Sequence, residues 1–248
     1  MADAALDGDI RRADEDRWLA SRFAPAVARA RLLALYAVNY EIARTGEVVR
    51  EPAVGDIRLA WWREALTAAL SGAGGSQHPA VQGFAEAARG AHFAAADIDA
   101  LIEARARDFD AAPFAAWADL EAYVDATAGG VMRLALAACN ASAPEALVRH
   151  GARAWGLTGL LRAAPIWRAR GRTVLPSGAD AHDLVARARA AHSEARALAR
   201  QAPSEAFPAL GYVALVPAYL KALEQGRTET ALFGRQLTLI WASATGGL

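Results

Sequence analysis

The chain has 248 residues, 54% of them hydrophobic, and its 27 Lys and Arg balance its 27 Asp and Glu. This length and composition allow a sizeable core and exclude general disorder, and the zero net charge excludes bulk attraction to nucleic acid. Cys139 is the single cysteine, which excludes an intrachain disulfide and a CxxC metal site. The polar, acidic N-terminal stretch lacks the apolar segment of a secretory signal, and no uncharged apolar run reaches the roughly 18 residues of a membrane span.

These bounds predict a soluble protein of the cytoplasm, with peripheral contact at the inner face of the cytoplasmic membrane left open. The abundance of arginine and alanine indicates a GC-rich bacterial coding bias. Five histidines without metal-ligand spacing predict no zinc site.

Strong helix formers (Ala, Leu, Arg and Glu) dominate the chain, and no sustained alternation of polar and apolar residues indicates a strand. We therefore expect an all-α protein. Residues 1–20 are predicted to be a polar lead-in with a short helix around Asp14–Ala20, and residues 21–248 to form a single helical domain. The helices of this domain are expected at Ala26–Thr45, ended or loosened by Gly46, then at Asp56–Leu70, Pro79 to about Gly90, Ala96–Phe109, Trp117–Ala138, from a capping box at Ser142–Glu145 to a break at Pro165, Asp180–Gln201, and Thr228 or Thr230 to Ala244.

The stretch Leu160–Pro176 is basic and holds the predicted end of a helix. Pro165 and Gly171 interrupt its helical period. No acidic residue occurs between Glu145 and Asp180, whereas four arginines crowd into the stretch, namely Arg162, Arg168, Arg170 and Arg172. Three interpretations stay open: an anion site that clamps a diphosphate, a face for anionic lipid headgroups or an acidic partner, and a solvated surface.

The same stretch resembles the second aspartate-rich motif of the squalene/phytoene synthase family, whose usual form is N-I-x-R-D-x-x-E-D-x-x-x-G-R-x-Y-L-P. The positions that match are Arg162, Gly171, Arg172, Leu175 and Pro176. The acidic positions of the motif fall on Ala163, Ile166 and Trp167. The frame of the motif is therefore kept, while its carboxylates are absent.

Four further segments are similar to the same family, in order and at compatible spacing, between about Asp16 and Trp241. They are Ala34–Ala37 in the first-motif helix, the W-W-R element within Arg58–Arg63, the H-P-V element at His78–Val81, and the Y-x-x-x-x-A-G-x-V pattern from Tyr123 to Val131. Of the two adjacent tryptophans, Trp61 and Trp62, one is expected in the core and one at a groove or interface, because neighbouring helical residues diverge by about 100°.

The resemblance implies an α-helical isoprenoid-synthase bundle around a central cavity, in which active members join two prenyl diphosphates using Mg²⁺ held by two aspartate-rich motifs. It places the ligand pocket at Tyr36, Tyr40, Glu41, Arg44, Glu47, Tyr123, Gly130 and Arg162, with Arg168, Arg170 and Arg172 as an anion or partner face. The first motif falls on Ala43–Glu47, where only Glu47 keeps a carboxylate and Arg44 adds positive charge. Glu41 and Glu47 point to different sides of a helix at about 100° per residue.

One branch of the family lacks the aspartates and includes an assembly factor for respiratory complex I. Its N-x-E-[IL]-A and A-F-P elements resemble Asn39–Ala43 and Ala206–Pro208. The resemblance implies a non-catalytic binding or assembly protein without a cofactor, whose partners would be complex I subunits and an isoprenoid or quinone-like lipid. Two alternatives stay open: an active prenyl-diphosphate-condensing transferase that uses Mg²⁺ or arginines in its place, and a helical scaffold without a ligand.

Overall fold

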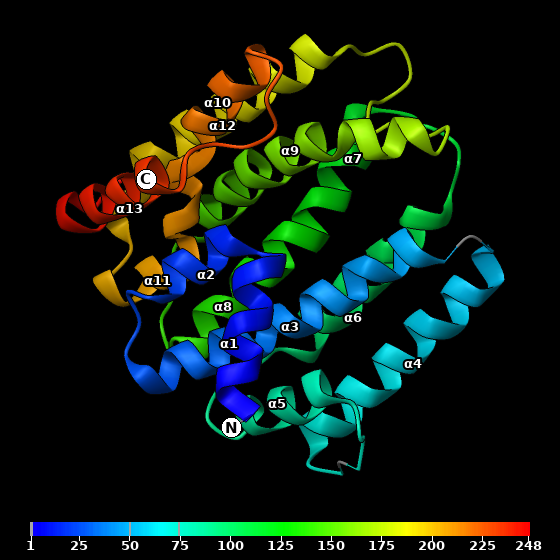
Figure 1. Ribbon diagram of the computed structural model, residues 1–248, viewed down its shortest axis with the longest axis vertical. Coiled ribbons are helices and arrows are strands. Elements are labelled where there is room, and N and C mark those ends of the chain that lie inside the picture. Colours follow the sequence, from blue (N-terminus) through cyan, green and yellow to red (C-terminus); the bar gives the residue numbers. More distant parts are fainter. Residues whose placement is uncertain (1, 50, 74) are drawn as a thin grey trace. The chain divides into compact units, whose positions relative to one another are not determined.

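The computed structural model describes residues 2–49, 51–73 and 75–248 (Figure 1), and within these ranges it contains helices and no strand. The prediction of an all-α protein is thereby confirmed. The chain divides into two compact units that are interleaved in sequence. The first comprises Met1–Asp110, Gly130–Ser142 and Glu205–Ala209, and the second comprises Ala111–Gly129, Ala143–Ser204 and Leu210–Leu248. The single domain expected over residues 21–248 stays a prediction.

The first unit is built around α3 (Ala26–Val48), in which every residue from Leu32 to Asn39 is buried. A helix that is apolar on all sides must be covered on all sides. The helices of this unit that pack on α3 are α1 (Ala2–Ala13), α2 (Glu15–Ser21), α4 (Pro52–Ser71), α5 (Pro79–Ala88), α6 (Ala95–Arg105) and α8 (Gly130–Ala138). A 3-10 turn, Ala106–Phe109, extends α6.

Two predictions for this unit need correction. The polar lead-in contains α1 as well as the predicted short helix, which forms as α2 with the side chain of Asp14 accepting a hydrogen bond from the Arg17 amide at its N-terminus. Gly46 does not end the helix, because α3 continues to Val48. A Cβ atom on Gly46 would lie 2.7 Å from the Cβ of Asp108, so the glycine permits close packing inside a continuous helix.

The second unit is organised around α9 (Glu145–Ala169), which packs along α10 (Ala181–Leu198). Its other helices are α7 (Trp117–Val124), α12 (Val216–Glu224) and α13 (Leu232–Thr245). Figure 1 shows α9, α10 and α12 side by side. Short turns complete the unit at Asp125–Gly129 (π-helical), Ala199–Gln201 and Gly211–Leu215 (both 3-10). Two further short elements, the 3-10 turn Ser204–Ala206 and α11 (Phe207–Leu210), contain residues of both units.

Helix α9 departs from its predicted form at both ends. The helix continues through the exposed Pro165 to Ala169, and the chain then turns at Gly171, whose φ of 70° favours glycine. Proline removes one backbone hydrogen bond, which is tolerated a single turn before the helix ends. The capping box at Ser142 does not form, since Pro144 occupies the N-cap without a side-chain hydrogen bond.

The helix predicted at Trp117–Ala138 is divided by the π-helical turn Asp125–Gly129 into α7 and α8. The Thr127 hydroxyl donates a buried hydrogen bond of 2.7 Å to the carbonyl of Tyr123, which helps to hold this wide turn. Such turns occur frequently at functional sites.

One stretch, Ser204–Glu224, is long and apolar enough to cross a membrane, judged by length and composition. Its most apolar window is 72% buried within the structure, as expected for a segment of a protein core. It contributes Tyr212 and Tyr219, which are fully buried and contact the ring of Trp155 on α9 at centroid distances of 5.0 and 6.1 Å.

Candidate functional site

The predicted pocket residues fall on both units, and each set is described within its own unit. On α3, Tyr36 is fully buried and Tyr40, one turn later, is half-buried. The guanidinium of Arg17 lies 5.8 Å from the centre of the Tyr36 ring and forms a 2.6 Å ion pair with Asp14. Tyr36 is therefore buried in the core of the first unit, and its pocket-lining role stays a prediction.

The acidic positions of the first motif are occupied mainly by side chains that cannot bind a hard cation. Ala43 is half-buried, Arg44 and Glu47 are exposed, and Glu41 lies one turn before Arg44. The Arg44 guanidinium approaches the Glu41 carboxylate to only 4.0 Å, with the Arg44 side chain 50% exposed. An exposed pair of this length contributes little to stability.

Asn39, one turn before Ala43, was not among the predicted pocket residues. It is 8% exposed, and its Oδ1 atom has no hydrogen-bond partner among the described residues. Buried side-chain oxygens are normally satisfied, so this atom is a candidate acceptor for a ligand donor or an ordered water. The sequence carried a signal for it, because Asn39 opens the N-x-E-I-A element.

On α9, Arg162 is held by the segment that precedes α13. Its Nε donates to the carbonyl of Thr228 at 3.0 Å, and its Nη2 donates to the Glu229 carboxylate at 2.8 Å. Its guanidinium also lies 4.0 Å from the centre of the Tyr219 ring. These contacts occupy two edges and one face of the guanidinium, so Arg162 is a structural clamp in this state.

The other arginines of the basic stretch lie beyond the end of α9. Arg168 and Arg170 are exposed, whereas Arg172 is half-buried with its guanidinium 5.8 Å from the centre of the Trp167 ring. The acidic positions of the second motif carry half-buried Ala163, Ile166, which is 55% exposed, and Trp167.

The last two predicted pocket residues flank the π-helical turn. Tyr123, at the end of α7, is 9% exposed and its ring lies 5.6 Å from that of Phe114 within the second unit. Gly130 is buried at the start of α8 in the first unit. A Cβ atom on Gly130 would make only ordinary contacts, the nearest at 3.5 Å to the carbonyl of Asp97.

A charged cluster in the second unit was not predicted. Arg153 on α9 donates to both carboxylate oxygens of Asp125, at 3.0 and 2.7 Å, and to Glu121 at 2.7 Å. Arg187 on α10 donates to the other oxygen of Glu121 at 3.0 Å. The hydrogen bond from Asp125 raises the pKa of Arg153 above its ordinary value, and the charge of Glu121 adds to this effect. The cluster joins the π-helical turn and α7 to the two longest helices of the unit.

Two family-like elements that lie apart in the sequence meet in the first unit. The ring of His78 lies 5.0 Å from that of Trp62 and 5.7 Å from that of Trp61. Trp62 is 5% exposed and Trp61 is 42% exposed, which confirms that one tryptophan is in the core and the other is not. Trp61 borders a cavity of about 780 Å³ between α4 and α5, which the sequence did not predict and whose walls include Ala65, Ala68, Gln82 and Arg89.

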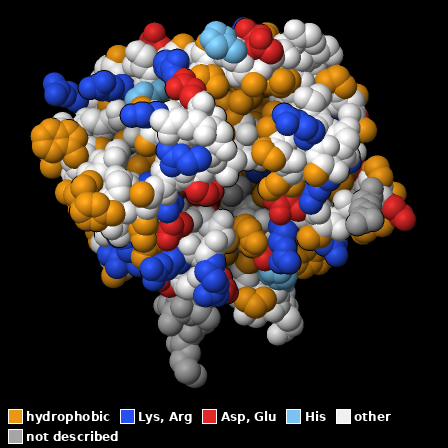
Figure 2. Space-filling view, turned by 45° about the horizontal axis from the view of Figure 1, so that its top comes forward, with side chains coloured by type: hydrophobic (Ala, Val, Ile, Leu, Met, Phe, Trp, Pro, Cys, Tyr) orange, Lys and Arg blue, Asp and Glu red, His pale blue; other side chains and the backbone are white. Residues whose placement is uncertain are grey.

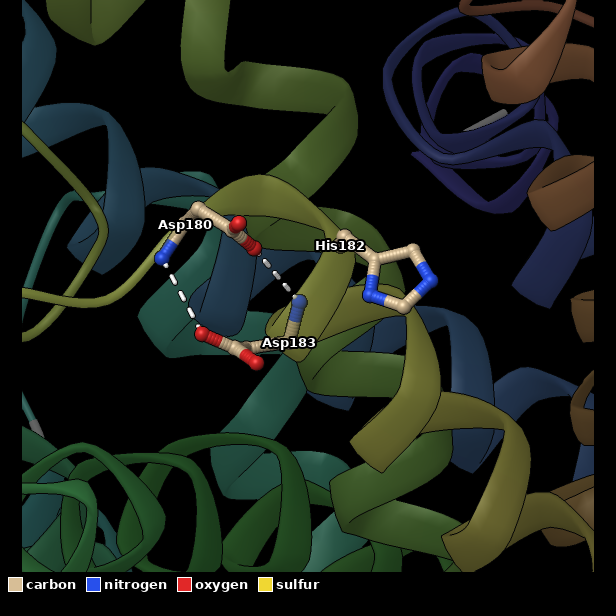
Figure 3. Close-up of side chains that lie close together, drawn as sticks. All are labelled: Asp180, His182 and Asp183. Carbon is tan, nitrogen blue, oxygen red and sulfur yellow. Dashed lines mark hydrogen bonds between the residues drawn. The ribbon is translucent and has the colours of Figure 1, made fainter.

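One group of side chains in the described part of the chain has ligand atoms spaced for a metal ion, namely Asp180, His182 and Asp183, all exposed (Figure 3). Asp180 accepts from the Asp183 amide at 2.9 Å, and Asp183 accepts from the Asp180 amide at 3.2 Å. Figure 3 shows the imidazole of His182 pointing away from both carboxylates. The two carboxylates form the capping box of α10, which explains their position without a metal.

Comparison with known proteins gives the following relationships. The family model described as "Squalene/phytoene synthase" matches residues 10–178. The curated relatives include complex I assembly factor 6 of NADH dehydrogenase (ubiquinone) from Mus musculus and from Bos taurus. Each is 25% identical to this chain over 240 residues, and each match covers 87% of this chain and 72% of the relative.

Two solved structures share the fold. A dehydrosqualene synthase in complex with ligand aligns with a TM-score of 0.78 at 15% identity, covering 98% of this chain and 95% of the other. The squalene synthase HpnC from Alicyclobacillus acidocaldarius aligns with a TM-score of 0.72 at 20% identity, covering 99% and 94%. The isoprenoid-synthase type of helical fold, predicted from the motifs, is confirmed.

Proposed function

Because the chain belongs to the squalene/phytoene synthase family, we propose that it is a non-catalytic member that acts as a binding or assembly protein for respiratory complex I. We place it in the cytoplasm at the inner face of the cytoplasmic membrane, and we propose an isoprenoid or quinone-like lipid as its small-molecule ligand. The proposal needs neither Mg²⁺ nor another cofactor.

The observation that carries the proposal is the set of side chains at the two aspartate-rich motifs. Ionising a prenyl diphosphate creates a multiply charged leaving group, which requires hard cations bridged to the protein by oxygen ligands. The first motif offers one exposed carboxylate, Glu47, beside the cationic Arg44. The second offers alanine, isoleucine and tryptophan. These side chains do not fit a cluster of Mg²⁺ ions.

Two carboxylates, one within the family's cavity-facing pattern and one just before it, do not replace the missing ligands. Asp125 and Glu121 lie one turn apart, a spacing that could suit a cation. Both are already neutralised by the guanidinium groups of Arg153 and Arg187. A metal at this place would have to displace four charge-assisted hydrogen bonds.

The curated relatives support the direction of the proposal. Complex I assembly factor 6 matches most of this chain, and its name describes an assembly factor rather than a prenyl transferase. The buried Oδ1 atom of Asn39 supports a ligand that carries a hydrogen-bond donor, such as the hydroxyl of a reduced quinone.

The enzymatic side of the proposal is tested with purified protein, Mg²⁺ and farnesyl or geranylgeranyl diphosphate. We expect no condensed product and no release of diphosphate. The matched pair is wild type and Glu47→Gln, since Glu47 is the last carboxylate of the first motif. Turnover by the wild type that Glu47→Gln abolishes would refute the non-catalytic assignment. Turnover that survives EDTA but is lost in Arg162→Ala would instead support a transferase in which arginine replaces the metal.

The assembly side is tested in a strain of the source organism that lacks the gene. We expect complex I to be depleted on native gels, with NADH oxidation by membranes reduced in parallel, and both to be restored by wild type and by Glu47→Gln. Normal complex I levels in the deletion strain would contradict the assembly role, whatever the outcome of the enzymatic test.

A further inference from the structure

The outward face of α13 in the second unit is apolar, although it is exposed to solvent. At about 100° per residue, one side of this helix carries the buried residues Arg235, Leu239 and Ala242. The opposite side carries four large apolar side chains, which are exposed as follows: Phe233 70%, Leu237 50%, Ile240 56% and Trp241 72%. We call these four residues the α13 stripe. Because both faces of the helix are apolar, burial of the inner face does not account for the stripe.

Contacts within the second unit fix the direction in which the stripe points. The inner face of α13 packs on the turn Gly211–Leu215, and the buried Arg235 guanidinium donates to the hydroxyl of Tyr219 at 3.5 Å. Arg162 holds Thr228 and Glu229 directly before the helix. These contacts therefore fix the stripe on the outward face of α13, because rotating the helix inward would break them.

The segment that carries the stripe has no acidic residue, and the unit to which it belongs has a net positive charge. No Asp or Glu occurs from Ala231 to Leu248, and the second unit carries thirteen Lys and Arg against nine Asp and Glu. Figure 2 shows hydrophobic side chains gathered at its left edge, the side on which Figure 1 draws α13. An apolar band on a unit of net positive charge complements an anionic bilayer surface.

The area of the stripe argues against a second copy of the chain as its occupant. With about 200 Å² for each aromatic side chain and somewhat less for each aliphatic one, the exposed fractions amount to roughly 450 Å². A stable dimer buries about 800 Å² on each partner. A shallow insertion into a headgroup region has no such threshold, and tryptophan and phenylalanine are typical of interfacial helices.

We propose that the α13 stripe is a membrane-contact surface that inserts into the interface of a bilayer containing anionic lipids. Phe233 and Trp241 are its anchors, because they combine the largest apolar area with the greatest exposure. This inference does not depend on the proposed function, and its test needs only the protein and vesicles.

The test is co-sedimentation of the full chain with vesicles of phosphatidylcholine, either alone or with about one third phosphatidylglycerol. We expect binding to the anionic vesicles that falls as salt is raised. The double variant Phe233→Ser/Trp241→Ser should lose about tenfold or more of this binding. The matched control is Val27→Ser/Ile57→Ser, which changes two apolar residues of the first unit with 65% and 69% exposure, and it should bind within about twofold of wild type.

Circular dichroism must show that both variants keep the wild-type melting temperature, as expected for exposed side chains. Equal loss of binding in both variants, or wild-type protein that stays in the supernatant with anionic vesicles, would overturn the inference. Binding to neutral vesicles as strong as to anionic ones would overturn its electrostatic part. A dimer in light scattering that the α13 variant dissociates, without vesicle binding, would assign the stripe to a second copy.

Discussion

Removing the guanidinium of Arg153 while keeping its aliphatic stem should destabilise the second unit measurably. Arg153→Met deletes three charge-assisted hydrogen bonds to Asp125 and Glu121, and it leaves two carboxylates one turn apart. The three side chains are 27%, 29% and 23% exposed, so the cost should lie between that of a surface pair and that of a buried one. We expect a loss of about 2 kcal/mol in the free energy of unfolding.

For a chain of this size, that loss corresponds to a melting temperature lower by about 4–8 °C, which thermal denaturation followed by circular dichroism can resolve. The control is Arg149→Met, an exposed arginine one turn earlier on the same helix. In a double-mutant cycle with Asp125→Asn, the two substitutions should be clearly less than additive. A melting temperature for Arg153→Met within about 1 °C of the Arg149→Met control would refute the view that this cluster holds α7 and the π-helical turn to α9.

Three further predictions concern single positions. Gly55→Ala should lower the free energy of unfolding by about 1–3 kcal/mol in urea titrations, because a Cβ atom there would lie 2.3 Å from the ring of Phe109. Burial raises the pKa of the Cys139 thiol to about 11, so the native protein should react with thiol reagents at pH 8 far more slowly than the urea-unfolded protein. The same pKa shift predicts that the contribution of this thiol to the free energy of unfolding is fully present below about pH 9 and is lost as the pH rises toward 11. Cys139→Ser should reduce this loss. Burial and, secondarily, the charge of Arg196 lower the pKa of His192, so its contribution to stability should be present above about pH 6.5 and lost as the pH falls, and His192→Gln should flatten that acid-side decline.

The fold was largely predictable because local signals and burial agree over most of the chain. The helix propensities, the proline that begins α5 and the capping aspartate of α10 placed most helices within a few residues of their positions. The errors arose where tertiary packing overrode a local signal. Gly46 was interpreted as ending or loosening the helix, but it allows α3 to approach Asp108. Pro165 was interpreted as a break, but it lies inside the last turns of α9.

The sequence predicted which carboxylates the candidate site lacks, but it did not predict which side chains contact one another there. Missing carboxylates at two motifs can be read from the residues themselves. The partners of Arg162 could not, since Glu229 lies 67 positions later and no local pattern links the two. The Arg153 cluster was missed for the same reason. Glu121 on α7 and Asp125 on the following turn lie one turn apart, and this spacing indicated a nearby cation.

The clamp between Arg162 and Glu229 has a consequence for any attempt to install catalysis in this scaffold. Aspartates placed at positions 163, 166 and 167 would add negative charge on the same helix end, while the arginine meant to receive a diphosphate would still be engaged by a carboxylate from a distant segment. An incoming anion would have to displace that carboxylate and the carbonyl of Thr228 from Arg162. It would thereby release the segment that leads into the last helix. Regaining the motif would therefore also demand a neutral residue at position 229.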